Sequence, residues 1–141
     1  GKTTYHGPGQ RIVYILMNLN NRKKDIRKFI NLIETSTIDL LKGLNINATT
    51  YQDRVGIWVK SKNIKEKKIA AIGIRIKKWV TYHGLSFNIN PNLNYYKNIH
   101  ACGLNNYSNT SLEELNYKLS EKEFDRSYLY HFKERLKNFS Y

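Results

Sequence analysis

The chain has 141 residues, enough for one domain with a sizeable core, and its 40% hydrophobic and 25% charged residues are ordinary for a folded domain. No apolar run approaches the roughly 20 residues that a membrane-spanning helix needs, so a membrane protein is not expected. The single cysteine, Cys102, excludes an internal disulfide and any metal site built from several cysteines.

The net charge is +13, from 24 Lys and Arg against 11 Asp and Glu. A charge of this sign first suggests nucleic acid as a partner. The basic residues are scattered, however, and their short clusters lie at the apparent ends of elements, at Arg22–Lys24, Lys65–Lys68 and Lys77–Lys78. We therefore interpret them as a solvated surface and expect no nucleic-acid binding; an acidic protein partner suits the charge equally well.

In chain order, the first predicted element is a strand. Residues 11–19 (RIVYILMNL) form a continuous apolar run after a Gly-Pro-Gly turn, which is typical of a strand buried on both faces. Apolar residues from Ile26 to Leu44 then recur at three- and four-residue steps. This spacing predicts an amphipathic helix over residues 24–42, with Gly43 as its C-terminal stop.

Three further strands are predicted in the middle of the chain, over residues 55–60 (VGIWVK), 68–76 (KIAAIGIRI) and 79–90 (WVTYHGLSFNIN). The last two read as a hairpin that turns at Lys77–Lys78. Because side chains alternate along a strand, His83 falls on the face of Leu85 and Phe87, which predicts a core histidine. Gly84, in mid-strand, indicates a bulge or the close approach of another backbone.

The C-terminal third is predicted to contain a loop and two helices. Residues 92–110 are rich in Asn and read as a loop. Ser111 with Glu114, and Ser120 with Glu123, are capping-box signatures that each open a helix. The second helix would gather apolar residues on one face: Phe124, Tyr128, Phe132, Leu136 and Phe139.

The resulting order of elements is β-α-β-β-β-α-α. This order predicts a mixed α/β (α+β) fold with substantial antiparallel pairing. We find no repeat and no linker, so we expect residues 1–141 to form a single domain.

Two glycine-containing segments could carry chemistry. From Thr4 to Gln10 (TYHGPGQ), the chain forms a tight loop where backbone can approach a ligand closely and where His6 can exchange a proton. An ordinary turn explains the same spacing. His83 with Gly84 forms the second segment, for which a buried core histidine is the simpler explanation.

Lys68 and Cys102 are the other two candidates. Lys68 opens a strand of small and apolar residues, where partial desolvation would free it to exchange protons near neutrality. A strand-end lysine that reaches solvent is the alternative. Cys102 precedes Gly103 in a loop, where a nearby cation would stabilise the thiolate that attacks carbonyl groups. An inert buried thiol is the alternative.

Taken together and in order, these segments resemble the lipoyl(octanoyl) transferase family. The matching segments are Gly1–Gln10 (GKTTYHGPGQ), Val55–Val59 (VGIWV), Lys68–Gly73 (KIAAIG), His83–Asn88 (HGLSFN) and Ala101–Gly103 (ACG). The family's opening motif begins with an Arg and a further Gly that are absent here. We therefore expect that the chain lacks the N-terminal segment of such an enzyme, and with it any targeting sequence.

The resemblance implies the fold of biotin and lipoate protein ligase catalytic domains, a mixed and largely antiparallel sheet with flanking helices. It also implies an acyltransferase that moves an octanoyl group from acyl carrier protein, through a cysteine thioester, to a lysine. The acceptors would be lipoyl domains of 2-oxoacid dehydrogenase complexes and the glycine-cleavage carrier protein, in the first step of protein lipoylation. No cofactor, metal, nucleic acid or membrane is implied, and the expected location is the cytoplasm.

The resemblance assigns Cys102 as the acyl-thioester nucleophile and Lys68 as the residue that lowers the pKa of its thiol and transfers protons. We expect the two side chains to lie about 3 to 4 Å apart. His83 would be a supporting residue, and neither His6 nor His83 is expected to bind a metal. The implied substrate-binding residues are Gly1, Lys2, Thr3, Thr4, Tyr5, His6, Ala71, Ile72, Gly73, Gly84, Leu85 and Ser86.

Two other functions stay open at this point. An ATP-dependent ligase for lipoate or biotin would keep a comparable lysine but lack the Cys-Gly nucleophile. A basic nucleic-acid-binding domain would need neither Lys68 nor Cys102 for its activity.

Overall fold

A computed structural model describes residues 5–61, 64–98 and 107–139. Its elements are, in order, β1 (Gln10–Tyr14), η1 (Leu19–Asn21, a 3-10 turn), α1 (Ile26–Gly43), β2 (Ala48–Tyr51), β3 (Arg54–Ser61), β4 (Ile64–Lys77), β5 (Val80–Asn88), η2 (Leu93–Asn98, 3-10), β6 (Ser108–Asn109) and α2 (Glu121–Leu136).

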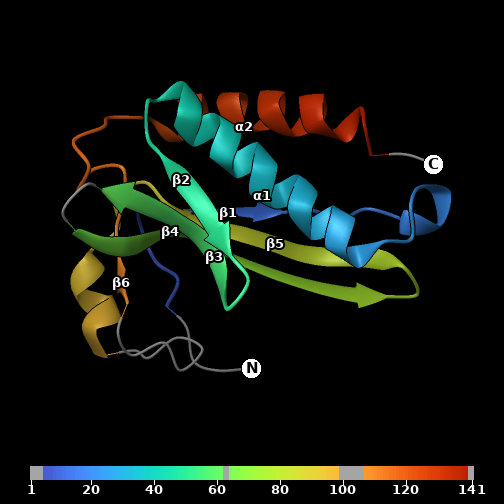
Figure 1. Cartoon of the computed structure of the whole chain (residues 1–141), viewed down its shortest axis with the longest axis horizontal. Coiled ribbons are helices and arrows are strands. Elements are labelled where there is room, and N and C mark those ends of the chain that lie inside the picture. The colour runs from blue at the N-terminus through green and yellow to red at the C-terminus, as the bar shows by residue number, and fades with distance from the viewer. Residues whose placement is uncertain (1–4, 62–63, 99–106, 140–141) are drawn as a thin grey trace.

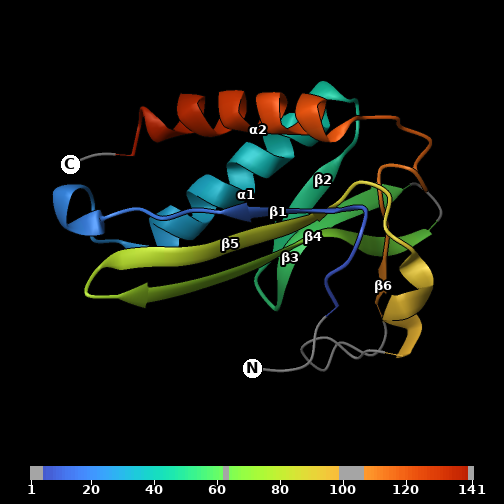
Figure 2. The same ribbon diagram turned by 180° about the vertical axis from the view of Figure 1, so that it is seen from behind.

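The strands form one sheet in the order β1-β5-β4-β3-β2, and all of these neighbours are antiparallel. β6 adds a short parallel pairing to β4. Both helices lie on the same side of the sheet, as the two opposite views show (Figures 1 and 2). The predicted mixed and largely antiparallel fold is therefore confirmed. Among the described residues, no helix combines the length and apolarity needed to cross a bilayer.

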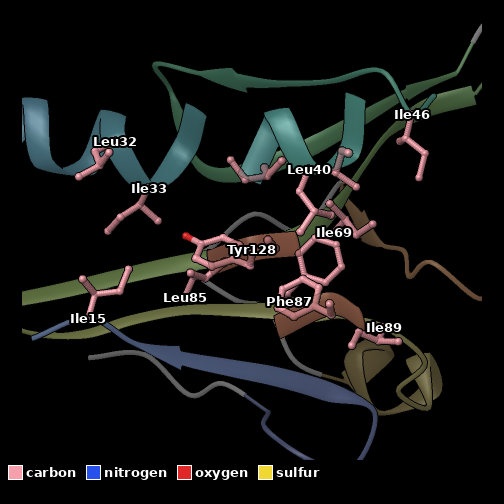
Figure 3. Packing of buried hydrophobic residues seen from close by; sticks show 14 of the residues in the cluster. Ile15, Leu32, Ile33, Leu40, Ile46, Ile69, Leu85, Phe87, Ile89 and Tyr128 are labelled. Carbon is pink, nitrogen blue, oxygen red and sulfur yellow. The ribbon is translucent and has the colours of Figure 1, made fainter. Parts of the chain in front are cut away.

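The hydrophobic core fills the space between the helices and the sheet (Figure 3). Ile33 and Leu40 of α1 and Leu85 and Phe87 of β5 are all buried there. The ring of Phe87 lies 4.7 Å from that of Phe124 in α2, centroid to centroid. Burial of such side chains contributes roughly 1.5 to 3 kcal/mol each, so this face of the sheet supplies most of the stabilisation. In the described residues, the opposite face carries no α-helix, and the short 3-10 helix η2 lies on that side (Figures 1 and 2).

The predicted first helix is confirmed as α1. Asp25 is its N-cap, and the carboxylate accepts a hydrogen bond from the Lys28 backbone N–H at 3.0 Å. Gly43 is the last helical residue rather than the stop. The left-handed conformation that follows is adopted by Asn45, with φ 60°.

The predicted helix after Ser120 is confirmed as α2, and both hydrogen bonds of its capping box with Glu123 are present. Two ion pairs fix its position. Arg135 donates to Asp39 of α1 at 2.6 Å, and Arg11 of β1 donates to Asp125 at 2.8 Å. The helix is thereby tied both to α1 and to the edge of the sheet.

The prediction of a first strand buried on both faces was wrong. β1 ends at Tyr14 and is an edge strand, whose odd-numbered residues face the helices and whose even-numbered residues face away. Tyr14 and Leu16 are 68% and 72% exposed. The apolar run gave no sign of this, because a strand with one open apolar face has the same composition as a fully buried one.

The predicted hairpin is confirmed, with its turn one residue later than expected. Lys77 pairs with Val80, and the two turn residues, Lys78 and Trp79, have φ of 51° and 64°. Positive φ at both central residues is the geometry of a type I′ turn, which matches the twist of the flanking strands. At the other end of the hairpin, Ala70 pairs with Phe87.

The prediction of a helix after Ser111 was wrong. Ser111 Oγ does accept a hydrogen bond from the Glu114 backbone N–H at 3.1 Å. The Glu114 carboxylate, however, accepts from Thr110 and Lys67 instead of returning to a cap. The segment forms turns, and Asn116 has φ 65°. The hydrogen bonds from Thr110 and Lys67 thus take the place of the hydrogen bond that the Glu114 side chain would accept from the Ser111 backbone N–H in a capping box.

Candidate active site

A bulge in β4 determines where Lys68 points. Ile57 of β3 pairs with Ala70, but the next residue, Trp58, pairs with Lys68, so β4 carries one extra residue at Ile69. Ile69 and Ala70 are both buried in the core. Because the extra residue reverses the alternation, the Lys68 side chain lies on the face of the sheet opposite the helices. We call this the open face.

On the open face, Lys68 is half-buried and lies against an indole ring. Its Nζ is 5.2 Å from the centre of the Trp58 ring. Its aliphatic stem passes over Gly56, where an added Cβ would be 3.2 Å from Lys68 Cδ and Cε. The neighbouring Lys67 points elsewhere, and its Nζ donates to Glu114 Oε1 at 2.9 Å. Burial raises the pKa of Glu114, but hydrogen bonds from Lys67 and Thr110 outweigh it and lower the pKa overall.

An aromatic cluster around Arg54 supports this end of the sheet. The Arg54 guanidinium is buried, with Cζ 3.9 Å from the ring centre of Tyr51 and 4.2 Å from that of Tyr107. The rings of Tyr107 and Trp58 are 5.2 Å apart. The sequence analysis did not predict this cluster. It included Trp58 only as part of a strand, and no short-range sequence pattern connects Arg54 with Tyr107.

Small residues continue the open face beyond Lys68. The register aligns Ala71 with Ser86 and Gly73 with Gly84, so all four face the same way. The other two residues assigned to substrate in these strands, Ile72 and Leu85, point to the helix side and pack into or against the core; only their backbones reach the open face. The structure therefore gathers four of the six predicted residues around one surface.

Gly84 is required by a close backbone approach, as its mid-strand position predicted. An added Cβ would lie 1.9 Å from the carbonyl oxygen of Val13 in β1. The prediction that His83 is a core histidine was wrong. His83 has φ 69° and an exposed side chain, because this unusual backbone conformation interrupts the alternation on which the prediction depended.

The opening loop lies at the same end of the molecule as η2. Tyr5 stacks on Tyr95, with ring centroids 4.9 Å apart, and meets Tyr96 edge-on. Burial, followed by the nearby Tyr5, raises the pKa of Tyr96 to about 12. The Tyr96 hydroxyl thus stays protonated, and it accepts a hydrogen bond from the Gln10 side chain. His6 is exposed.

Asn88 links this loop to the strand that follows the cysteine segment. Its Oδ1 accepts from Gln10 Nε2 at 3.1 Å, and its Nδ2 donates to the Thr110 carbonyl at 3.0 Å. The Thr110 N–H in turn donates to the Lys68 carbonyl at 2.8 Å. The backbone on the far side of the cysteine segment is therefore fixed beside Lys68.

Several predicted site residues lie outside the described residues. These are Cys102 and the first four residues of the opening motif, Gly1, Lys2, Thr3 and Thr4. The distance from Lys68 to Cys102 stays a prediction. Within the described ranges, no group of three or more His, Cys, Asp or Glu side chains is arranged to hold a metal ion.

The described geometry can serve covalent acyl chemistry. It offers a lysine cation at one end of a surface floored by small residues, together with the packed rings of Tyr5, Tyr95 and Tyr96. An apolar chain could lie on the small residues while its reactive carbonyl is held near the cation.

Comparison with known proteins identifies the family of the chain. Residues 1–133 match the model of the lipoyl protein ligase A/B catalytic domain. An octanoyltransferase of Wolbachia pipientis (strain wPip) is 51% identical over 126 residues, covering 89% of this chain and 61% of the relative. One from Bartonella tribocorum is 45% identical over 133 residues, 89% of this chain and 54% of the relative. The chain thus spans about half to three-fifths of the length of these relatives.

Solved structures share the fold at low sequence identity. A lipoate protein ligase from Thermoplasma acidophilum superposes with a TM-score of 0.73 at 14% identity, over 97% of this chain and 55% of that one. A biotin protein ligase from Aquifex aeolicus gives 0.70 at 17% identity, over 92% and 54%. These likenesses confirm the predicted fold.

Proposed function

This chain belongs to the lipoyl protein ligase A/B catalytic domain family, and from that premise we propose that it carries the acyl-transfer site of an octanoyltransferase. The enzyme would take an octanoyl group from acyl carrier protein and give it to a lysine of a lipoyl domain or of the glycine-cleavage carrier protein. The observation that carries the proposal is the bulge at Ile69, which turns Lys68 onto the open face beside the floor of small residues.

The proposed nucleophile is Cys102. It precedes Ser108 by six residues, and Ser108 pairs with Lys67 in the parallel ladder of β6. Six residues of chain span at most roughly 20 Å, a length that is compatible with the proposed contact between the thiol and the Lys68 ammonium. An ammonium beside the sulfur would favour the thiolate, which is only a small fraction of a free cysteine near neutral pH.

In the first half-reaction, the Cys102 thiolate attacks the thioester carbonyl of the octanoyl carrier. The carrier's sulfur leaves as a thiolate and takes the proton of the Lys68 ammonium, so that Lys68 becomes neutral while the octanoyl group becomes a thioester on Cys102. Acylation removes the negative charge of the thiolate. The Lys68 ammonium then lacks the opposite charge that favoured its protonated form, so it gives up its proton more readily.

In the second half-reaction, the amine of the acceptor lysine attacks the acyl-cysteine carbonyl. Lys68, now neutral, accepts the proton that the amine must lose, and Cys102 leaves as a thiolate. This step forms the amide product and restores the starting ion pair of the Cys102 thiolate and the Lys68 ammonium. The two half-reactions thus use the same pair of residues in opposite protonation states.

The acyl chain would lie along Ala71, Gly73, Gly84 and Ser86. A side chain at Gly73 would occupy the open space above the sheet, because nothing lies within 4 Å of a Cβ added there. At Gly84, an added Cβ would instead meet the backbone of β1. At roughly 0.8 kcal/mol per buried methylene, the six methylenes and the terminal methyl of an octanoyl group would contribute several kcal/mol to binding. The opening loop, whose Tyr5 ring packs on Tyr95 and Tyr96 of η2, would form a wall near the reacting end.

The net charge of +13 suits the carrier partners of this reaction. Acyl carrier proteins and lipoyl domains are typically acidic, and opposite charges speed the encounter of two proteins. We propose that the basic surface recruits these domains and takes no part in the chemistry.

The test is a transfer assay with purified octanoyl-acyl carrier protein and an unmodified lipoyl domain, without ATP. The assay uses the protein as it occurs in the cell. We expect an increase of one octanoyl group in the mass of the lipoyl domain. Modification only when ATP and free octanoate or lipoate are supplied would instead identify a ligase.

A further inference from the structure

The outer edge of β4 is unpaired over its second half. β4 pairs with β5 from Ala70 to Lys77, but its pairing with β3 goes no further than Ala70. In Figures 1 and 2, the β2–β3 hairpin turns away from β4 at this point, while β4 and β5 continue together. Within the described residues, β4 from Ile72 to Lys77 therefore has a strand on one side only.

The hydrogen-bonding direction of this edge follows from its neighbours. On β5, the His83 carbonyl accepts from Ile15 N, and Ile89 N donates to the Gly9 carbonyl, so the odd-numbered residues face β1. The even-numbered residues, including Gly84, must then face β4. Their partners on β4 are Ala71, Gly73 and Arg75.

The remaining residues of the edge, Ile72, Ile74 and Ile76, direct their backbone N–H and C=O groups outward. Three alternate residues with outward-facing backbone groups form a template for an added strand.

The side chains of the same isoleucines line a groove beneath α1. The groove has a volume of about 540 Å³. α1 contributes Ile26, Ile30 and Glu34 to it, and the β2–β3 hairpin closes one end with residues that include Val55. Ile26 and Val55 are 42% and 60% exposed, so the groove presents apolar surface to solvent. An exposed strand edge and an apolar groove thus coincide on the same three residues.

A strand added to this edge would reach both faces of the sheet. Its side chains alternate, so one set would enter the groove beneath α1 and the other would lie on the open face beside Gly73. Ile72 is four residues from Lys68 along β4. The part of the added strand beside Ile72 would therefore lie roughly 13 Å from Lys68 along the strand direction, and the part beside Ile76 roughly twice as far.

Charge decides between the possible occupants. Two copies of this chain would each bring a net charge of +13, and Arg75, Lys77 and Lys78 beside the edge would face the same residues of the other copy. Nucleic acid has no backbone that continues a β-ladder. An acidic protein domain with an edge strand satisfies both the hydrogen bonds and the charge.

We propose that the domain carrying the acceptor lysine docks by adding an edge strand to β4 along Ile72–Ile76, with apolar side chains in the groove beneath α1. This inference rests on the proposed function for the identity of the partner. Docking at this edge holds the acceptor in the plane of the sheet, so that its lysine can approach Lys68 across the open face.

Amide hydrogen exchange on the wild-type chain tests the docking without requiring turnover. In the free protein, the outward amides of Ile72, Ile74 and Ile76 should exchange much faster than those of Gly73 and Arg75. Saturating unmodified lipoyl domain should slow the three isoleucine amides at least tenfold. Binding of the domain without this protection would overturn the proposal. Protection in the chain alone that grows with its concentration would also overturn it, because self-association would then occupy the edge.

Proline substitution gives the functional test. Ile74→Pro removes one outward donor that the β4–β5 ladder does not use. The matched control is Ile12→Pro, which removes an outward donor from β1 at the opposite edge of the sheet. We expect Ile74→Pro to weaken lipoyl-domain binding at least tenfold in calorimetry and Ile12→Pro to leave it unchanged. Equal binding by both variants would overturn the docking site.

The two proposals fail in different ways. Formation of the octanoyl adduct from octanoyl-acyl carrier protein does not involve the acceptor, so Ile74→Pro should acquire it at the wild-type rate. A wild-type protein that forms no adduct would reject the proposed chemistry, while the exchange and binding measurements would still decide the docking surface. If Ile74→Pro does not fold, hydrogen exchange on the wild-type protein decides whether the acceptor domain docks at this edge.

Discussion

Gly84 lies against Val13 so closely that a Cβ on Gly84 would be 1.9 Å from the Val13 carbonyl oxygen. Gly84→Ala must therefore push β1 away from β5, which holds one edge of the sheet. We expect the free energy of unfolding to fall by about 2 kcal/mol or more in urea denaturation.

Gly73 supplies the control for this substitution. It is the pairing partner of Gly84 on β4, but an added Cβ there meets nothing within 4 Å. Gly73→Ala should change stability by about 0.5 kcal/mol or less. Equal losses in the two variants would mean that Gly84 is not needed for the approach of β1.

Lys68 and Lys67 are neighbours with different tasks. If Lys68 is the proton carrier, Lys68→Met should reduce octanoyl transfer by at least a hundredfold while the protein stays folded. Lys67→Met breaks only the ion pair with Glu114 and should retain most of the activity. Comparable activity of both variants in the transfer assay would remove Lys68 from the mechanism.

Arg54 should be needed to hold Tyr107 beside Trp58. Arg54→Lys loses the planar group that lies between Tyr51 and Tyr107, so we expect about 1 to 2 kcal/mol less stability in urea denaturation. The control is Lys60→Met, whose ammonium is 6.0 Å from the ring centre of Tyr51. A larger loss for Lys60→Met than for Arg54→Lys would contradict this role.

The ion pair between α1 and α2 should make stability depend on pH. The hydrogen bond from Arg135, together with its charge, holds the pKa of Asp39 below its usual value. The stabilisation is therefore complete above the ordinary carboxyl pKa of about 4 and is lost as the pH falls through the lowered value.

Arg135→Met tests this dependence. Because the pair is partly exposed, we expect the variant to be only about 0.5 to 1 kcal/mol less stable at neutral pH, with the difference shrinking below about pH 4. Lys137→Met, which breaks a pair inside α2 with Glu134, is the control. A difference for Arg135→Met that stays constant down to low pH would exclude the ion pair as its cause.

Local patterns in the sequence predicted the regular elements well. The periodicity from Ile26, the capping box at Ser120 and the apolar alternation through the hairpin each depend on residues a few positions apart. The sequence analysis did not predict β2. This strand has only four residues, Ala48–Tyr51, and all of them are half-buried, so they show no clear alternation.

What the sequence could not predict depends on distant contacts. The bulge at Ile69 appears only in the register between β3 and β4, yet it determines the face on which Lys68 lies. The exposed position of His83 follows from a positive φ that non-glycine residues adopt rarely. The Glu114 carboxylate, which was expected to complete a helix cap, instead accepts a hydrogen bond from Lys67, 47 residues earlier in the chain.

The most direct test of the proposed acyl transfer is to find the atom that carries the acyl group. The protein as it occurs in the cell is mixed with octanoyl-acyl carrier protein, the reaction is stopped in acid, and the digested protein is analysed by mass spectrometry beside a Cys102→Ala variant. We predict one octanoyl group on the peptide that contains Cys102, sensitive to hydroxylamine as a thioester is, and none on the variant. An octanoyl group that persists on the Cys102→Ala variant, or lipoyl-domain transfer by that variant at the wild-type rate, would contradict the mechanism.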